Sequence, residues 1–305
     1  MSKLTFFLLI LFFLTGCRNY KKQELQLLSD TLITELSDSS LFSNNINGIS
    51  LISDKICFAD YVEGNIVVLD DNLCLQYKVG KHGNGPDENV GVSHFVGDES
   101  SFYLLDEGSR SIKEFSLSGT FLSRINIPDN VVYAPWARFI YFDSLFYLPN
   151  IKGSVASVIN RQGQIVKLFG RESGEVGGKI LLLDKNHIWA IGMTSPVIEK
   201  YSKDGLLVDS LIYRDIPIVE EIIRKKKNTE NSFMAIVNDA CLSNGKLYLL
   251  LAHKVLCISI AGKIQLETTF LLPHGFYNSI SVDKNKLYSI NIRNMSIERF
   301  TIPDD

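Results

Sequence analysis

Two glycine-rich segments of this sequence, residues 79–88 and 169–178, carry charged side chains of both signs at short spacing. In each segment a basic residue directly follows the first glycine, and acidic residues come shortly after it. A cation beside carboxylates can hold a polar ligand through charge-assisted hydrogen bonds, so these side chains are candidates for a binding rim. The alternative is that they are solvated loop charges that bond to neighbouring backbone. The candidates are Lys81, His82, Asp87, Glu88, Arg171 and Glu172.

The first of these segments does not have the pattern of a phosphate-binding loop. No Gly-Lys-Ser/Thr follows its glycines, and no helix is signalled after it. Glycines that can take positive φ, with Pro86 to stiffen the path, instead suit a chain that crosses from one sheet to the next. We therefore expect both segments to be crossings between neighbouring sheets.

Residue patterns that are typical of catalysis are hard to find. The histidines show no HExxH or comparable ligand spacing, and there is no G-x-S-x-G elbow. Asp60 and Asp106 end equivalent apolar runs, so they could line a channel and bind calcium, as in a metal-dependent hydrolase. More often an Asp in this position starts a turn by bonding to nearby backbone. We therefore predict no catalytic residue and no cofactor, with calcium left open as the alternative.

The cysteines in the body of the chain lie in or beside apolar, strand-like runs. They form no CxxC pair and no dense framework, which favours buried free thiols over disulfides or a metal cluster. An exported chain could still pair them. They are Cys57, Cys74, Cys241 and Cys257.

The charge of the chain is nearly balanced. Its 305 residues include 31 basic and 34 acidic side chains, for a net charge of −3. There is no basic excess to support binding of nucleic acid. The length suits one large domain or two small ones, and we expect a monomer.

Past residue 45 the chain consists of short apolar or alternating segments separated by Asp, Asn, Gly and Ser, which is the pattern of strands and turns. Residues 101–125 form one unit: a strand, a turn that starts at an Asp, an alternating strand, a glycine turn and a further strand. This order recurs along the chain. The second strands of the copies begin near residues 55, 101, 145, 187, 246 and 286.

The period is roughly 40–46 residues, apart from one longer interval, and each copy has room for four strands. It predicts an all-β, six-bladed β-propeller with four-stranded antiparallel blades over residues 31–305, rather than two β-sandwiches that repeat by chance. The last copy stops short of an outer strand, and closing the ring would remove an exposed sheet edge. We expect residues 31–36 to supply that strand. The longer interval contains residues 217–228, which predict a short amphipathic helix.

The first residues have the features of an export signal. A short basic start precedes an apolar run that is too short for the about 20 residues of a transmembrane helix. The run ends in Leu14-Thr15-Gly16-Cys17, which resembles the bacterial lipobox, where the cysteine is lipidated and becomes the first residue. This predicts a signal peptide over residues 1–16, a lipid on Cys17 and a tether over residues 17–30. An ordinary signal peptide or a short transmembrane anchor are the alternatives.

Two further stretches carry a resemblance to a known group. One is Tyr103-Leu104-Leu105-Asp106 with the arginine, isoleucine and phenylalanine that follow it, and the other is Gly83-Asn84-Gly85-Pro86-Asp87-Glu88. With the repeat, they resemble the six-bladed β-propeller lipoproteins of Bacteroidetes, which are akin to the NHL and TolB-like propellers. The resemblance covers nearly the whole chain after Cys17 and implies an envelope protein held to a membrane by its lipid.

The resemblance implies little about activity, because the fold hosts enzymes, binders and scaffolds alike. The leading interpretation is a binding or scaffold module for a glycan, peptide or protein partner. The alternative is a metal-dependent hydrolase or lyase of the six-bladed class. No acidic residue directly follows Cys17, which favours the outer membrane and its periplasmic side over the cell surface.

Overall fold

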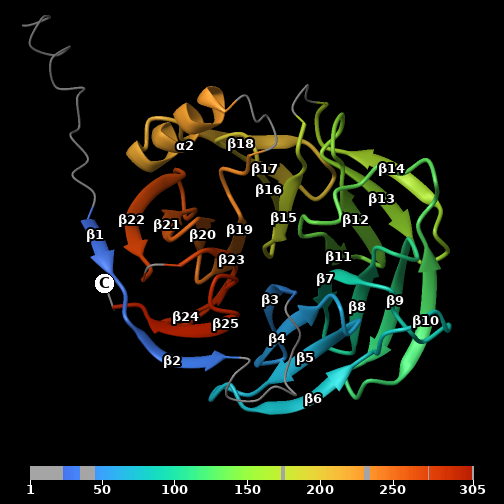
Figure 1. Ribbon diagram of the computed structural model, residues 1–305. Coiled ribbons are helices and arrows are strands. Elements are labelled where there is room, and N and C mark those ends of the chain that lie inside the picture. Colours follow the sequence, from blue (N-terminus) through green and yellow to red (C-terminus); the bar gives the residue numbers. More distant parts are fainter. Residues whose placement is uncertain (1–22, 35–44, 173–175, 230–233, 274, 304–305) are drawn as a thin grey trace, which may run out of the picture.

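The computed structural model describes residues 23–34, 45–172, 176–229, 234–273 and 275–303. Six sheets stand in a ring around a central axis (Figure 1). Within each sheet, or blade, consecutive strands pair antiparallel from the inside of the ring outwards. The predicted six-bladed β-propeller is therefore confirmed.

The bounds of the strands follow the predicted repeat. Blade 1 consists of β3 (Ile46–Ile52), β4 (Lys55–Asp60), β5 (Asn65–Leu69) and β6 (Leu75–Val79). Blade 2 consists of β7 (Val92–Gly97), β8 (Ser101–Asp106), β9 (Ser111–Ser116) and β10 (Phe121–Asn126). Blade 3 consists of β11 (Ile140–Phe142), β12 (Leu145–Pro149), β13 (Ala156–Asn160) and β14 (Ile165–Phe169). Blade 4 consists of β15 (Lys179–Leu183), β16 (His187–Gly192), β17 (Val197–Ser202) and β18 (Leu207–Ile212). Blade 5 consists of β19 (Asp239–Ser243), β20 (Lys246–Leu251), β21 (Lys254–Ser259) and β22 (Gln265–Leu271). Blade 6 consists of β23 (Tyr277–Asp283), β24 (Lys286–Asn291), β25 (Ser296–Thr301) and β2 (Ser29–Thr34). The second strand of every blade begins at the predicted residue.

The apolar runs exist because neighbouring blades pack face to face. Successive side chains of a strand point to opposite faces of its sheet, so a central strand of a blade is apolar on both sides. In β4, Ile56 and Phe58 pack against blade 6, whereas Cys57 and Ala59 pack against blade 2. The outer strand β6 is mostly exposed, in keeping with its more polar sequence.

The ring is closed by the N-terminal part of the described chain. β2 pairs antiparallel with β25 and forms the outer strand of blade 6, as predicted. β1 (Gln23–Gln26) pairs parallel with β22, which gives blade 5 a fifth strand. The structure thus places strands within residues 23–30, a range that the sequence assigns to the tether. The predicted signal peptide, Cys17 and residues 35–36 lie outside the described residues.

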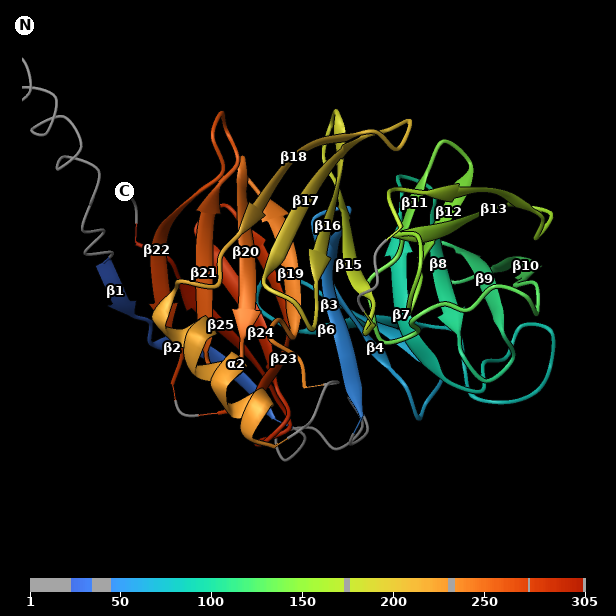
Figure 2. The ribbon, with the colours of Figure 1, turned by 90° about the horizontal axis from the view of Figure 1, so that it is seen from above.

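The predicted helix is α2 (Pro217–Asn228), which lies against the outside of the ring beside β18 and β22 (Figures 1 and 2). Pro217 starts the helix, where no backbone N–H is needed, and three lysines in the last turn suit the helix dipole. Val219 is buried in the apolar cluster between blades 4 and 5. In the part of the chain that the structure describes, no helix has the length and apolar character needed to cross a bilayer.

Within the described residues no disulfide joins the four cysteines of the body, in agreement with the predicted thiols. Cys57, Cys241 and Cys257 are buried, but Cys74 is exposed, so its predicted burial is wrong. Cys74 lies in the turn between β5 and β6, where Leu73 fills the interior instead.

Candidate functional site

One end of the ring axis opens into a cavity of about 380 Å³, which we call the mouth cavity. It lies where the inner strands begin, so crossings between blades and the turns after the second strands surround it. Residues from all six blades and their crossings line it. The lining side chains used below are those of Asn47, Tyr61, His94, Glu107, Trp136, Phe276 and Asn278.

Aromatic rings form the apolar part of the mouth cavity. Trp136 and Phe276 are 49% and 50% exposed. The indole N–H of Trp136 donates a long hydrogen bond, 3.4 Å, to the Gly177 carbonyl. The Tyr61 ring lies against Gly91, where a Cβ would come within 2.6 Å of Tyr61 Cζ and displace the ring.

The hydroxyl of Tyr61 stays protonated over the neutral pH range. Burial raises its pKa first, and the nearby carboxylates of Glu107 and Asp106 raise it further. Tyr61 can therefore donate a hydrogen bond into the mouth cavity.

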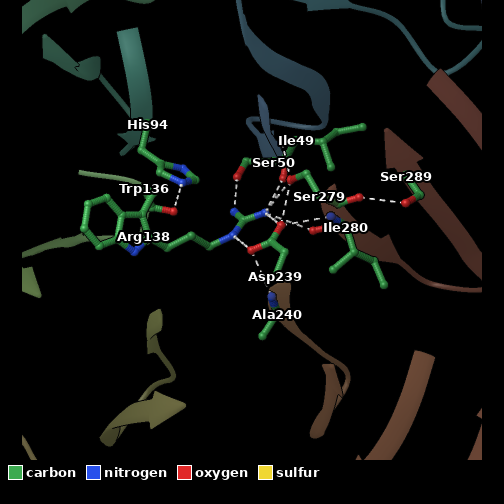
Figure 3. A network of polar contacts seen from close by, with 10 residues as sticks. All are labelled: Ile49, Ser50, His94, Trp136, Arg138, Asp239, Ala240, Ser279, Ile280 and Ser289. Atoms are coloured by element: carbon green, nitrogen blue, oxygen red, sulfur yellow. Dashed lines mark hydrogen bonds and ion pairs between the residues drawn. The ribbon is translucent and has the colours of Figure 1, made fainter. Parts of the chain in front are cut away.

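Asp239 lines the mouth cavity and forms an ion pair with Arg138, and we call this pair the floor (Figure 3). Arg138 Nε lies 2.5 Å from Asp239 Oδ1, and Nη2 lies 2.6 Å from Oδ2, so the guanidinium binds the carboxylate in bidentate fashion. The guanidinium also donates to Ser50 Oγ at 2.6 Å and to the carbonyls of Ile49 and Ile280 at 2.7 and 3.0 Å. Because Arg138 precedes blade 3 and its partners belong to blades 1, 5 and 6, its side chain crosses the axis of the ring.

His94 also lines the mouth cavity. Its Nε2 lies 3.0 Å from the carbonyl oxygen of Trp136 (Figure 3). Because a carbonyl can only accept, Nε2 carries the proton and Nδ1 is left as an acceptor. Burial, assisted by the positive charge of Arg138, lowers the pKa of His94 to about 4, so the ring is neutral near pH 7.

Amide side chains complete the polar part of the mouth cavity. Asn278 Nδ2 donates to the Ile46 carbonyl at 3.1 Å and to Asn47 Oδ1 at 3.4 Å. Asn278 Oδ1 is buried and has no hydrogen-bond partner among the described residues. A buried acceptor without a partner is costly, and a ligand could reach this oxygen only if the Asn278 side chain moved.

The predicted rim residues of the first glycine-rich segment bond to one another. Lys81 Nζ lies 3.4 Å from Asp87 Oδ2 and 3.3 Å from Glu88 Oε1. The carboxylate of Glu88 also accepts the Gly85 N–H at 2.8 Å. His82 forms an isolated bridge with Asn89. The segment is a crossing from β6 to β7, as expected, and its charges hold its own loop together.

The second glycine-rich segment crosses from β14 to β15, and its charges belong to a separate cluster. Arg171 Nε lies 2.6 Å from Glu199 Oε1, and Lys179 Nζ lies 2.5 Å from Glu199 Oε2. Although burial raises the pKa of Glu199, these two cations hold it below its usual range. Glu172 is exposed. The structure thus divides the six predicted rim residues between two crossings, and neither group is part of the described lining of the mouth cavity.

Of the two aspartates that could have lined a channel, Asp60 starts a turn, whereas Asp106 binds the crossing before its own blade and the buried ammonium of Lys113 at 2.9 Å. Asp106 Oδ1 accepts the backbone N–H groups of Val90 and Gly91 at 3.2 and 3.1 Å. Asp60 Oδ1 accepts the N–H of Glu63 at 3.1 Å. Within the described residues, no three or more His, Cys, Asp or Glu side chains are grouped so that they could hold a metal ion.

The residues of the mouth cavity carry no motif that sequence reasoning could detect. Their shared signal is positional: Trp136, Arg138 and Phe276 come shortly before an inner strand, and Tyr61 and Glu107 directly follow a second strand. Once the repeat is aligned, these places in each copy identify the side chains that face the mouth.

Solved structures of other propeller proteins are similar to this chain. A streptogramin B lyase matches with 15% identity and a TM-score of 0.58, over 90% of this chain and 88% of that chain. A protein from Bacteroides fragilis that is described as exported matches with 11% identity and a TM-score of 0.60, over 92% and 99% of the two chains. A catalytically inactive virginiamycin B lyase from Staphylococcus aureus, solved with quinupristin, matches with 13% identity and a TM-score of 0.55, over 89% and 88%. Identities this low show the fold alone.

No protein of curated function matches the chain in sequence. Residues 18–191, which are more than half of the chain, match the family described as "6-bladed beta-propeller". That match agrees with the six blades and with the ring that they form. The chain therefore belongs to the six-bladed β-propeller family.

Proposed function

We propose that this chain is a lipid-anchored envelope protein whose propeller binds a small polar ligand, such as a glycan or peptide, in the mouth cavity. The observation that carries the proposal is the mouth cavity itself, in which half-exposed aromatic rings stand beside polar side chains. Concave sites with apolar walls and a few convergent polar groups are the usual form of small-molecule sites.

The membrane anchor in this proposal is supported by the N-terminal sequence. The apolar run and Leu14-Thr15-Gly16-Cys17 have the form of a lipoprotein signal. The described chain begins with β1 only a few residues after Cys17, so a lipid there would hold the ring close to a membrane.

The two tryptophans of the chain allow a direct test of ligand binding. Trp136 is half exposed in the mouth cavity, whereas Trp189 is fully buried. We would measure acrylamide quenching of the detergent-solubilised full chain with a pool of oligosaccharides and with a pool of tripeptides. The proposal expects one pool to protect the exposed tryptophan, and Trp136→Phe to remove the response.

Two results would contradict the proposal. In one, neither pool changes the quenching of Trp136. In the other, the wild type and Trp136→Phe respond alike, so that the effect does not come from the mouth. Turnover of a pool in the presence of calcium would instead support the hydrolase or lyase interpretation.

A further inference from the structure

We infer that the ligand of the mouth cavity is a neutral carbohydrate, an inference that rests on the binding function proposed above. Three features of the mouth cavity carry it: the placement of its exposed rings, the hydrogen-bond acceptors in its lining, and the absence of cationic side chains from its described lining.

The exposed rings offer flat apolar surfaces on opposite sides of the axis. Trp136 precedes β11 of blade 3 and Phe276 precedes β23 of blade 6, and these blades face each other across a ring of six. A sugar ring has faces of C–H groups that carry a small positive charge, which suits stacking on the negative face of an aromatic ring.

The lining of the mouth cavity offers hydrogen-bond acceptors to a ligand. His94 Nδ1 is an acceptor because Nε2 holds the proton. The carboxylate of Glu107 is a second acceptor in the lining. Sugar hydroxyls and N-acetyl amides can donate to both, whereas sulfate, phosphate and carboxylate groups cannot.

The charge of the lining also favours a neutral ligand. The described lining includes no Lys or Arg, and the Arg138 guanidinium beneath it is bound to Asp239 and to carbonyls. Glu107 therefore gives the mouth a negative character that repels anionic glycans. The cavity volume of about 380 Å³ lies within the range of roughly 300–1,000 Å³ that is usual for small-molecule sites.

The test is binding of the detergent-solubilised full chain to an array of neutral, N-acetylated, sulfated and sialylated oligosaccharides. We expect binding to neutral or N-acetylated members and rejection of the sulfated and sialylated ones. The affinity for the best-bound neutral glycan is then measured by titration for each variant.

Trp136→Ala should weaken that affinity at least tenfold, because the stacking surface is lost. Asn278→Leu should also weaken it, because a polar side chain of the lining is removed. The matched control is Tyr77→Ala, which removes an exposed aromatic ring from β6 on the outer edge of blade 1 and should leave affinity unchanged. Circular dichroism of each variant shows whether the ring has folded.

The inference is overturned if no neutral glycan binds, if only anionic glycans bind, or if Trp136→Ala binds neutral glycans as well as the wild type does. If tripeptides protect Trp136 from quenching while no neutral glycan binds, the mouth is a binding site and only the carbohydrate inference fails. If neither kind of ligand reaches Trp136, the proposed function fails with it.

Discussion

Arg138 and Asp239 are the buried charges on which the centre of the ring depends. Their side chains are 11% and 4% exposed, and every acceptor around the guanidinium belongs to another blade or crossing. Burying two charges is costly, and only a close pair with further hydrogen bonds offsets the loss of water. The pair therefore ties four blades to one point on the axis.

Removing one member of this pair should destabilise the protein strongly. Arg138→Ala leaves the Asp239 carboxylate buried without its cation, which is expected to lower the free energy of unfolding by about 3–5 kcal/mol. Urea denaturation measures the loss. The double variant Arg138→Met/Asp239→Asn, which restores neutrality, should lose less than Arg138→Ala. Equal losses in the two variants would argue against a charge-based role.

His94 makes stability depend on pH in the acidic range. The pKa of His94 is lowered from 6.5 to about 4 by burial and by Arg138, so between these values the unfolded chain binds more protons than the folded one. The free energy of unfolding should therefore fall as the pH decreases from 6.5 towards 4, by up to about 3 kcal/mol in all. Above pH 6.5 this contribution is fully present. Below pH 4 it falls no further.

His94→Gln serves as the reference for this pH effect. Glutamine can donate to the Trp136 carbonyl but does not titrate, so subtracting its pH profile isolates the histidine from the carboxylates of the rest of the chain. Identical profiles for the wild type and the variant would contradict the assignment.

At the scale of elements, β1 and β2 act together as a strap around the rim of blades 5 and 6. β1 pairs with β22 and β2 with β25, so the chain spans two blades within twelve residues, 23–34. Ion pairs fix both parts: Lys254 with Glu24 at 3.1 Å, and Arg299 with Asp30 at 2.7 Å. Exposed ion pairs of this kind contribute little to stability. Burial of apolar surface between the two strands must therefore contribute more to holding the strap in place.

Leu27, between the two strands, provides that burial. It is 2% exposed and packs into the cluster between blades 5 and 6, whereas its neighbour Leu28 is 76% exposed. We expect Leu27→Ala to lower the free energy of unfolding by about 2–4 kcal/mol. Leu28→Ala should change it by less than about 0.5 kcal/mol. Thermal and urea denaturation of the two variants compare them, and similar losses would show that the strap is not held by Leu27.

At the scale of the whole molecule, the sequence predicted the ring well and its centre poorly. The period of strands, α2 and the closing strand β2 depend on local patterns: alternation, turn residues and a helical stripe. The floor depends on Arg138 and Asp239, which are 101 residues apart and meet only because the ring brings their blades together. The composition of the glycine-rich segments predicted a binding rim. In the structure, however, Lys81 and Arg171 form ion pairs with carboxylates near their own crossings.

The lipid anchor is a prediction about the whole molecule as well. In cells fed a palmitate analogue, the wild-type chain should become labelled and stay with the membrane fraction, and Cys17→Ala should lose both properties. Cys74→Ala is the matched control, because it removes an exposed thiol from the body of the ring and should change neither. Labelling that survives Cys17→Ala would rule out this site of attachment.

The position of β1 on the rim sets the largest distance between the ring and such an anchor. Residues 18–22 separate Cys17 from Gln23, the first residue of β1, and the six chain steps between them span at most about 20 Å when fully extended. A lipid on Cys17 would therefore keep the rim of blade 5 within a short distance of the membrane. The protein would then meet ligands only in a thin layer beside the membrane. Within that layer a ligand that is itself attached to the same surface meets the mouth at a high effective concentration, so modest intrinsic affinity would suffice for capture.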